Sequence, residues 1–300
     1  MPAPRTLSLL NLLIVALNFV WIASLENGYF FNFSFTDTIA FYPSFLTPAK
    51  FTYKIWIFVG FIMIMAAYMM YQGSQDTQLN INTVKKVEKI DYLLILNQMA
   101  LGLSMTLKHN DFFMWSILYS TVCLVTIFMI NRRINIKRLT SNSVTRYFIR
   151  LGFGVYTGWL MFVLGFNIAA VLSKNSVHIG EELFFYLNVL ILVLVTIAMA
   201  VYSYYYFLPS VSAVLAWGSY GVYYKFSQNP ISDNYDIKPY LIMAMAVGGI
   251  LTAYNYYRCT VKAKNCSKHY GRTSCHILTD LSSLTVIILS ASHKKALIER

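Results

Sequence analysis

Charge is the scarcest property of this chain of 300 residues: Asp, Glu, Lys and Arg make up 12% of it, whereas hydrophobic residues make up 57%. Soluble domains carry about 25% charged residues, so the chain lacks the polar side chains needed to cover a globule of its size. The apolar residues come in unalternated blocks of about twenty, the length that a helix needs to cross a ~30 Å hydrocarbon core. The composition predicts an all-α polytopic membrane protein and excludes an outer-membrane barrel.

Acidic residues are missing from the predicted spans, in which only Lys54 and Arg150 are ionisable, and both lie near span ends. Because ion-coupled transporters usually need an intramembrane acid, active transport is disfavoured. The sequence also lacks a Walker loop and the HExxH and GxSxG motifs. We therefore expect no enzyme and no catalytic residues.

Cysteine is also scarce, and three of the four residues, Cys259, Cys266 and Cys275, lie near His269 and His276. Their intervals do not match a standard zinc finger. Free thiols on a reducing inner face are the favoured interpretation, and a zinc site is the weaker alternative. We expect no metal.

Eight spans fit the apolar blocks. They cover about residues 7–25, 51–71, 92–107, 112–130 and 147–172, a sixth block that ends in the aromatic run 202–207, and blocks 209–225 and 239–258. The third span is short and turns at Lys108–Asp111. Lys and Arg concentrate in the segments that face inward if the N-terminus does, which places both termini on the cytoplasmic side, or in the matrix or stroma of an organelle. This bias accounts for the net charge of +12 without a nucleic-acid partner. The expected partner of the basic inner face is anionic lipid.

The last residues, 259–300, form a basic tail with its own pattern. Its apolar positions recur at helical spacing, at Ile277, Leu281, Leu284 and Ile288. This period predicts an amphipathic helix lying in the membrane interface. A helix packed on a partner subunit is the alternative.

Amides within the spans, Asn18, Asn97, Asn167 and Asn188, are the polar groups of most interest. Such groups usually bond to a neighbouring helix, worth about 0.6 kcal/mol on average, and lining a pocket is the alternative. In the fifth span, Gly154, Gly158 and Gly165 form a small-residue face that should seat another helix closely. The adjacent arc carries Trp159, Phe166 and Asn167, which suits a flat apolar ligand with one polar handle; packing is the simpler reading of Trp159 alone.

Several of these residues recur together in a known family. The run Tyr42-Pro43-x-x-Leu46-Thr47-Pro48-Ala49, followed by Ile55-Trp56, resembles the loop and second span of the tryptophan-rich sensory (TspO/MBR-related) proteins, and most closely their eight-span branch. Further pieces agree in order: Asn18, Asn97, Arg150-Leu151-x-Phe153-x-x-Tyr156-x-Gly158-Trp159 with Asn167, and Trp217-Gly218-x-x-Gly221. The resemblance covers roughly residues 10–225.

This resemblance implies a five-helix core in residues 1–172 around a pocket for porphyrins or sterol-like molecules, with three further helices in 173–258. The matching positions make Trp56, Asn97, Trp159 and Asn167 the candidate pocket residues. A tetrapyrrole or a lipid is the implied ligand, and the implied role is sensory or regulatory.

The chain departs from the family in ways that suggest an alternative. It has only 5 Trp, and Ala100 and Gly152 stand where the family usually has Trp and Pro. A fold that has lost aromatic walls could instead serve as an accessory subunit among other membrane subunits, for example in a respiratory-chain assembly of the mitochondrial inner membrane.

Overall fold

The computed structural model describes residues 4–29, 41–75, 81–138, 144–174, 180–232 and 234–270, without the side chains of 81–83, 138, 144–146 and 260–270. Its α-helices are α1 (Pro4–Glu26), α3 (Ile55–Gln75), α4 (Ile81–Ile90), α5 (Leu93–His109), α6 (Phe113–Arg133), α7 (Val144–Lys174), α8 (Glu181–Tyr206), α9 (Pro209–Gln228) and α10 (Lys238–Tyr270). Two 3-10 helices, η1 (Lys50–Lys54) and η2 (Ile136–Arg138), accompany them, and the described residues contain no strand.

The predicted all-helical membrane fold is confirmed. Eight long helices lie where the apolar blocks are, and among the described residues five of them are long and apolar enough to cross a membrane. A sixth span results if α4 and α5, which meet at a bend of 50°, are counted together. The helices α9 and α10 are less apolar, so the count of eight spans stays a prediction.

Two boundaries differ from those predicted. The charged segment after α3 contains α4, whose Val87 and Ile90 are buried one turn apart while Lys85 and Lys89 are exposed. The lysines of this segment made it look like a charged loop, so the helix was not predicted. The last helix continues past Arg258 to Tyr270, so the first part of the predicted tail is helical. The proposed interfacial helix at 277–288 lies outside the described residues.

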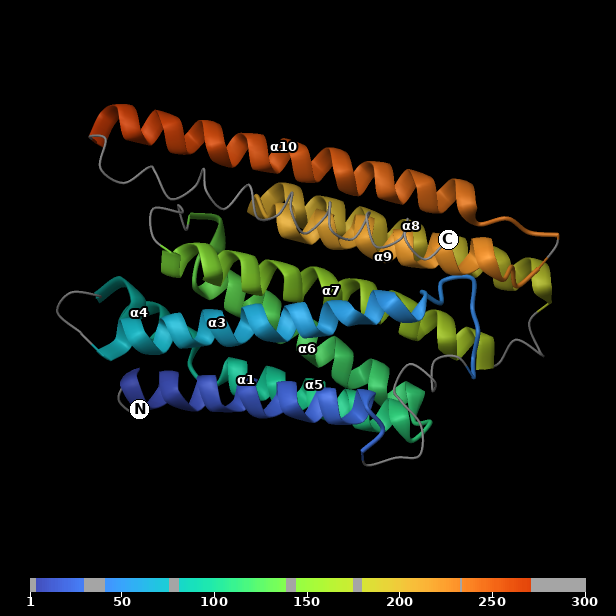
Figure 1. Ribbon diagram of the computed structural model, residues 1–300, viewed down its shortest axis with the longest axis horizontal. Coiled ribbons are helices and arrows are strands. Elements are labelled where there is room, and N and C mark those ends of the chain that lie inside the picture. The colour runs from blue at the N-terminus through green and yellow to red at the C-terminus, as the bar shows by residue number, and fades with distance from the viewer. Residues whose placement is uncertain are drawn as a thin grey trace, which may run out of the picture.

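The helices run along the long axis of the molecule, with α1 on one side, α10 on the other and α7 in the middle (Figure 1). Helix α7 contacts α3, α6, α8 and α9. Its most apolar window is 78% buried within the chain, against 28% for α1 and for α8. A helix enclosed on all sides must offer every neighbour a surface that fits.

Three of the four glycines of α7 provide two of these surfaces. Gly154 and Gly158 face α9, where a Cβ on Gly158 would lie 3.1 Å from the Cα of Val211. Gly165 faces α8, and a Cβ there would lie 2.6 Å from Val195 Cγ2. Close backbone approach of this kind maximises dispersion contact, the main attraction available between helices in lipid.

The two-proline turn before η1 is docked onto α8 and α9. Within the turn, the backbone N–H of Ser44 donates to Thr47 Oγ1 at 2.8 Å. The N–H of Ala49 donates to the carbonyl of Gly221 in α9 at 3.0 Å. Phe45, 1% exposed, packs against rings from both helices, Phe184, Phe185 and Phe226. The turn is therefore part of the core at this end of the bundle.

We expect Phe45→Ala to lower the free energy of unfolding by about 3 kcal/mol, because it removes a fully enclosed ring and leaves a cavity. Unfolding in detergent, followed by circular dichroism, measures this loss. Phe41→Ala is the control, since Phe41 lies in the same segment and is 64% exposed. Equal losses for the two variants would contradict the docking of the turn.

Candidate ligand-binding site

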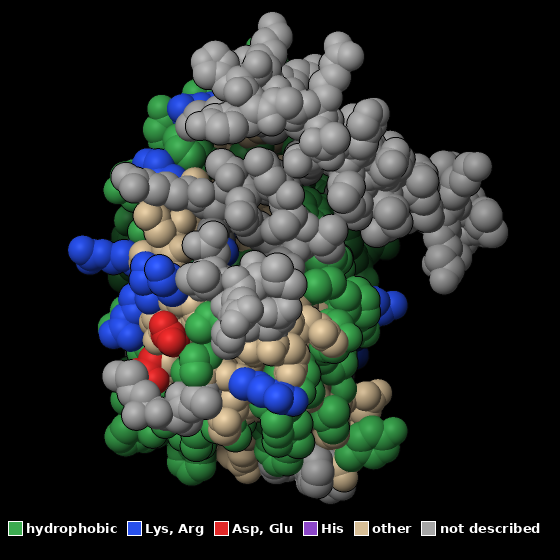
Figure 2. Space-filling view, turned by 90° about the vertical axis from the view of Figure 1, so that its left-hand side faces the viewer, with side chains coloured by type: hydrophobic (Ala, Val, Ile, Leu, Met, Phe, Trp, Pro, Cys, Tyr) green, Lys and Arg blue, Asp and Glu red, His purple; other side chains and the backbone are tan. Residues whose placement is uncertain are grey.

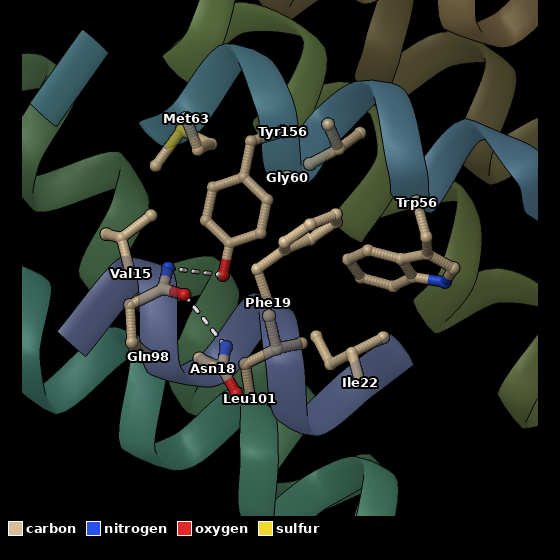
Figure 3. A pocket seen from close by; sticks show the side chains of 11 residues that line it. Val15, Asn18, Phe19, Ile22, Trp56, Gly60, Met63, Gln98, Leu101 and Tyr156 are labelled. Atoms are coloured by element: carbon tan, nitrogen blue, oxygen red, sulfur yellow. Dashed lines mark hydrogen bonds between the residues drawn. The ribbon is translucent and has the colours of Figure 1, made fainter. Parts of the chain in front are cut away.

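A small cavity lies among α1, α3, α5 and α7 (Figure 3). Its volume is about 20 Å³, room for about one water molecule. The lining is mostly apolar, with two amides and one phenol: Val15, Asn18, Phe19, Ile22, Trp56, Val59, Gly60, Met63, Gln98, Leu101 and Tyr156. A second cavity of about 10 Å³ lies between α7 and α8 near Leu46.

Hydrogen bonds connect the polar wall of the first cavity. Asn18 Nδ2 of α1 donates to Gln98 Oε1 of α5 at 2.8 Å, and Gln98 Nε2 donates to Asn97 Oδ1 at 3.1 Å. The hydroxyl of Tyr156 in α7 donates to the same Asn97 oxygen at 2.7 Å. Figure 3 shows Gln98 between Asn18 and Tyr156. The network joins three helices that are distant in sequence.

Asn97 is fully occupied by this network and by α6. Its Nδ2 donates to the carbonyl of Cys123 at 2.7 Å and to Thr126 Oγ1 at 2.8 Å. An amide group has two donor hydrogens and one acceptor oxygen, and all of them are in use. Asn97 therefore ties helices together here, and its role as a ligand contact stays a prediction.

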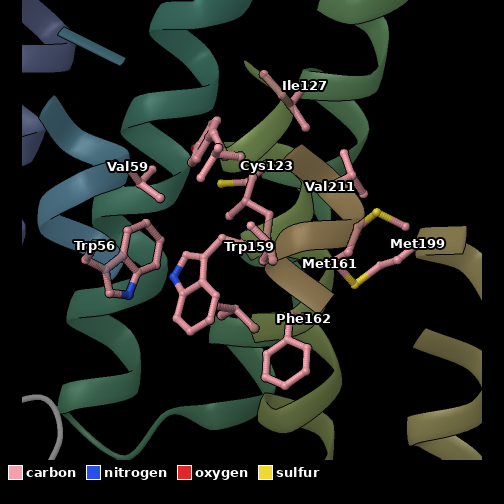
Figure 4. Packing of buried hydrophobic residues seen from close by; sticks show 14 of the residues in the cluster. Trp56, Val59, Cys123, Ile127, Trp159, Met161, Phe162, Met199 and Val211 are labelled. Carbon is pink, nitrogen blue, oxygen red and sulfur yellow. The ribbon is translucent and has the colours of Figure 1, made fainter. Parts of the chain in front are cut away.

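Trp56 lines the cavity and contacts a second tryptophan, Trp159, which lies beyond the lining. The rings of Trp56 in α3 and Trp159 in α7 meet edge to face, with centroids 6.0 Å apart and planes at 83° (Figure 4). Trp159 also stacks on Phe162, at 5.9 Å and 14°. Both indole N–H groups are buried, and neither has a hydrogen-bond partner among the described residues. A buried donor without an acceptor costs about 1–3 kcal/mol.

The fourth candidate, Asn167, lies farther along α7 and contacts a buried lysine. Its Oδ1 accepts a hydrogen bond from Lys108 Nζ, which also lies 4.8 Å from the centre of the Phe166 ring. Lys108 is only 1% exposed. The prediction that Lys108 lies in a turn was wrong, because α5 continues to His109 and directs the Lys108 side chain toward α7. An acceptor amide and an aromatic face together favour a buried ammonium group.

Of the four predicted pocket residues, the structure brings Trp56 and Trp159 into contact, and Trp56 lines the cavity. Asn97 is linked to Trp159 through Tyr156, one helical turn away on α7. Gln98, which follows Asn97 directly, lines the cavity but was not among the predicted residues; a second amide beside the first was the available signal. Of the other two amides for which lining a pocket was the alternative, Asn18 lines the cavity, and Asn188 Nδ2 donates to the Phe184 carbonyl within α8.

Outside the bundle core, a polar rim covers the two-proline turn. Lys174 Nζ pairs with the carboxylate of Asp111 at 2.5 Å. Desolvation raises the pKa of Tyr42 beside this pair, and the hydrogen bond and charge of Asp111 raise it further. In the part of the chain that the structure describes, no three His, Cys, Asp or Glu side chains gather as a metal site. The side chains of Cys266 and His269, and residues Cys275 and His276, lie outside that part.

Comparison with known proteins gives one finding. A family model described as TSPO-like protein matches residues 8–256, which extends from the second turn of α1 to near Arg258 in α10. No curated protein and no solved structure was found to match the chain. The matched region includes all the residues that line the cavity.

We expect Tyr156→Phe to lower the free energy of unfolding by about 1 kcal/mol, because it deletes the donor to Asn97 without changing the ring. Unfolding in detergent is again the measurement. Tyr186→Phe, on α8 and 55% exposed, removes a hydroxyl from the surface and should leave stability unchanged. An unchanged Tyr156→Phe protein would show that the network contributes nothing to the core.

Proposed function

The chain belongs to the TSPO-like protein family and is an integral membrane protein, and on this basis we propose that it binds a flat apolar ligand, a tetrapyrrole or a lipid-like molecule, in a regulatory role. The family is generally non-enzymatic. We propose the same for this chain, since amides, an indole, a phenol and apolar side chains line its cavity.

The observation that carries this proposal is the pair of buried indole N–H groups on Trp56 and Trp159, which have no acceptor among the described residues. Buried polar groups in native proteins nearly always have a partner, and an exception calls for a bound molecule or a role. A flat ligand with an acceptor atom would supply the partner while its apolar surface replaced side-chain contacts.

The ligand has to enlarge the cavity, because binding pockets usually measure about 300–1,000 Å³ and this one measures about 20 Å³. The seam between α1 and α3 is the expected route. There the ring of Phe19 lies on Gly60 so closely that a Cβ on the glycine would be 2.0 Å from Phe19 Cδ2. Since α1 is largely exposed to lipid, Phe19 can swing outward without disturbing α7.

We expect protoporphyrin to bind the purified protein, and Trp159→Phe to weaken binding about tenfold, because one N–H donor is worth about 1.4 kcal/mol. The shift of the porphyrin absorption band measures binding without relying on tryptophan emission. Trp115→Phe is the matched control, since Trp115 on α6 is 57% exposed and away from the cavity. Equal affinities for the two variants would place the ligand elsewhere.

An accessory subunit of a large membrane assembly, such as a mitochondrial respiratory-chain complex, is the second candidate. The nearly filled core supports it. The outward face of α8 is available to such a partner and carries a line of exposed apolar side chains: Leu183, Tyr186, Leu190, Leu194, Ile197, Val201, Tyr204 and Tyr205. Such a face serves lipid or a neighbouring subunit equally well.

Purification from its native membrane in mild detergent separates the two candidates. As a regulatory binding protein, the chain should migrate alone or as a small oligomer and bind the porphyrin. Migration in a large complex without porphyrin binding would instead establish the subunit role.

A further inference from the structure

The turn between α8 and α9 holds an unusual backbone conformation. Phe207, the residue that ends α8, has φ 54° and ψ 47°, the left-handed region that a bulky side chain seldom adopts. Ser203 fixes the turn, because its carbonyl accepts from the N–H of Leu208 at 3.1 Å and its hydroxyl donates to the Leu208 carbonyl at 2.8 Å. This conformation ends α8, and α9 begins two residues later at Pro209.

Three cations from three other elements converge on Phe207. Arg150 of α7 donates from Nη2 to the Phe207 carbonyl at 2.5 Å. Arg258 of α10 lies with its Cζ 4.3 Å from the centre of the Phe207 ring, and Lys137 Nζ of η2 lies 5.0 Å from it. Lys137 and Arg258 are both half-buried, so part of each side chain faces outward.

The placement of Lys137 depends on a turn of its own. Helix α6 ends at Arg133, and Asn135 takes φ 52° before η2 begins. This reversal brings Lys137 to the end of α8, where its Nζ also lies 4.2 Å from the centre of the Tyr205 ring. Asn tolerates the left-handed conformation better than most residues, so the local sequence favours the reversal.

The charge around this cluster is unbalanced. The same end of the bundle carries further basic residues at helix ends: Arg5, Lys85, Lys86, Lys89, Arg132 and Arg133. Glu88 and Asp91 are the acidic residues that the described part has at this end. Figure 2, which views this end, shows prominent basic and few acidic side chains. The ion pairs Lys174–Asp111 and Lys238–Asp236 lie at the opposite end.

From this geometry we infer that the α8–α9 turn binds the phosphate headgroup of an anionic phospholipid, held by Lys137 and Arg258, with Arg150 adding its charge. A guanidinium that stacks on a ring keeps the N–H groups at its edge free for phosphate oxygens. The exposed rings of Tyr204, Tyr205 and Tyr254 surround the site, and tyrosine is enriched at the level of lipid headgroups. Basic pockets between membrane helices bind such headgroups.

Lipid titration followed by native mass spectrometry tests this inference on the full chain. We expect dioleoyl phosphatidylglycerol to bind at least tenfold more tightly than dioleoyl phosphatidylcholine, which has the same acyl chains and no net charge. The double variant K137Q/R258Q should lose this preference. The control K225Q/K238Q neutralises two cations at the other end of the bundle and should keep it. An unchanged preference in K137Q/R258Q, or its loss in the control, would overturn the site.

A single variant and a competition experiment complete the test. If K137Q/R258Q fails to fold, judged by its melting transition, the half-buried Lys137→Gln alone carries the test, with an expected loss of at least threefold. Excess inorganic phosphate should not displace the phosphatidylglycerol, because acyl chains contribute to its binding. Complete displacement would reassign the site to a soluble phosphate compound. The inference is independent of the proposed ligand, whose cavity is lined by other residues. The α8 surface considered for a neighbouring subunit includes Tyr204 and Tyr205 of this site, so the titration is made on the purified chain without partners.

Discussion

The enclosure of α7 by four other helices is the constraint on which the rest of the structure depends. Between helices in a bilayer the hydrophobic effect supplies little attraction, so association depends on close packing and on hydrogen bonds. Helix α7 uses glycine on the sides toward α8 and α9, and aromatic rings toward α3. Its Thr157 and Tyr156 hold polar contacts toward α6 and α5. One helix thus sets the positions of its neighbours.

Apolar block length was sufficient to predict the long helices, because each block must cross the same thickness of lipid. The same criterion did not predict α4, where lysines outnumber the two buried apolar residues, Val87 and Ile90. The polar contacts were beyond prediction for a different reason. Asn97 bonds to residues 26 and 59 positions away, and Lys108 to one 59 positions away. Sequence spacing identifies such groups but does not reveal which partner each one meets.

The same limit applies to the predicted site. Trp56 and Trp159 were predicted from motif positions, and the structure places them in contact. The amides could not be separated into structural and ligand-binding groups, because an asparagine has the same chemistry in both roles. The hydrogen bonds of Asn97 show its structural role, because its donors and its acceptor are all in use; its ligand contact stays a prediction.

The energetics of the core indicate which element would move for a ligand. Helix α3 is anchored through η1, since Trp217 Nε1 of α9 donates to the Thr52 carbonyl at 3.3 Å and the turn before it bonds to Gly221. The hydrogen bonds between α1 and other helices include Ser8 with Ser74, Asn18 with Gln98, and Trp21 with Thr106. At about 0.6 kcal/mol each, they contribute about 2 kcal/mol. Displacing part of α1 would break bonds of this size, whereas separating α3 from α9 would also break the docked turn.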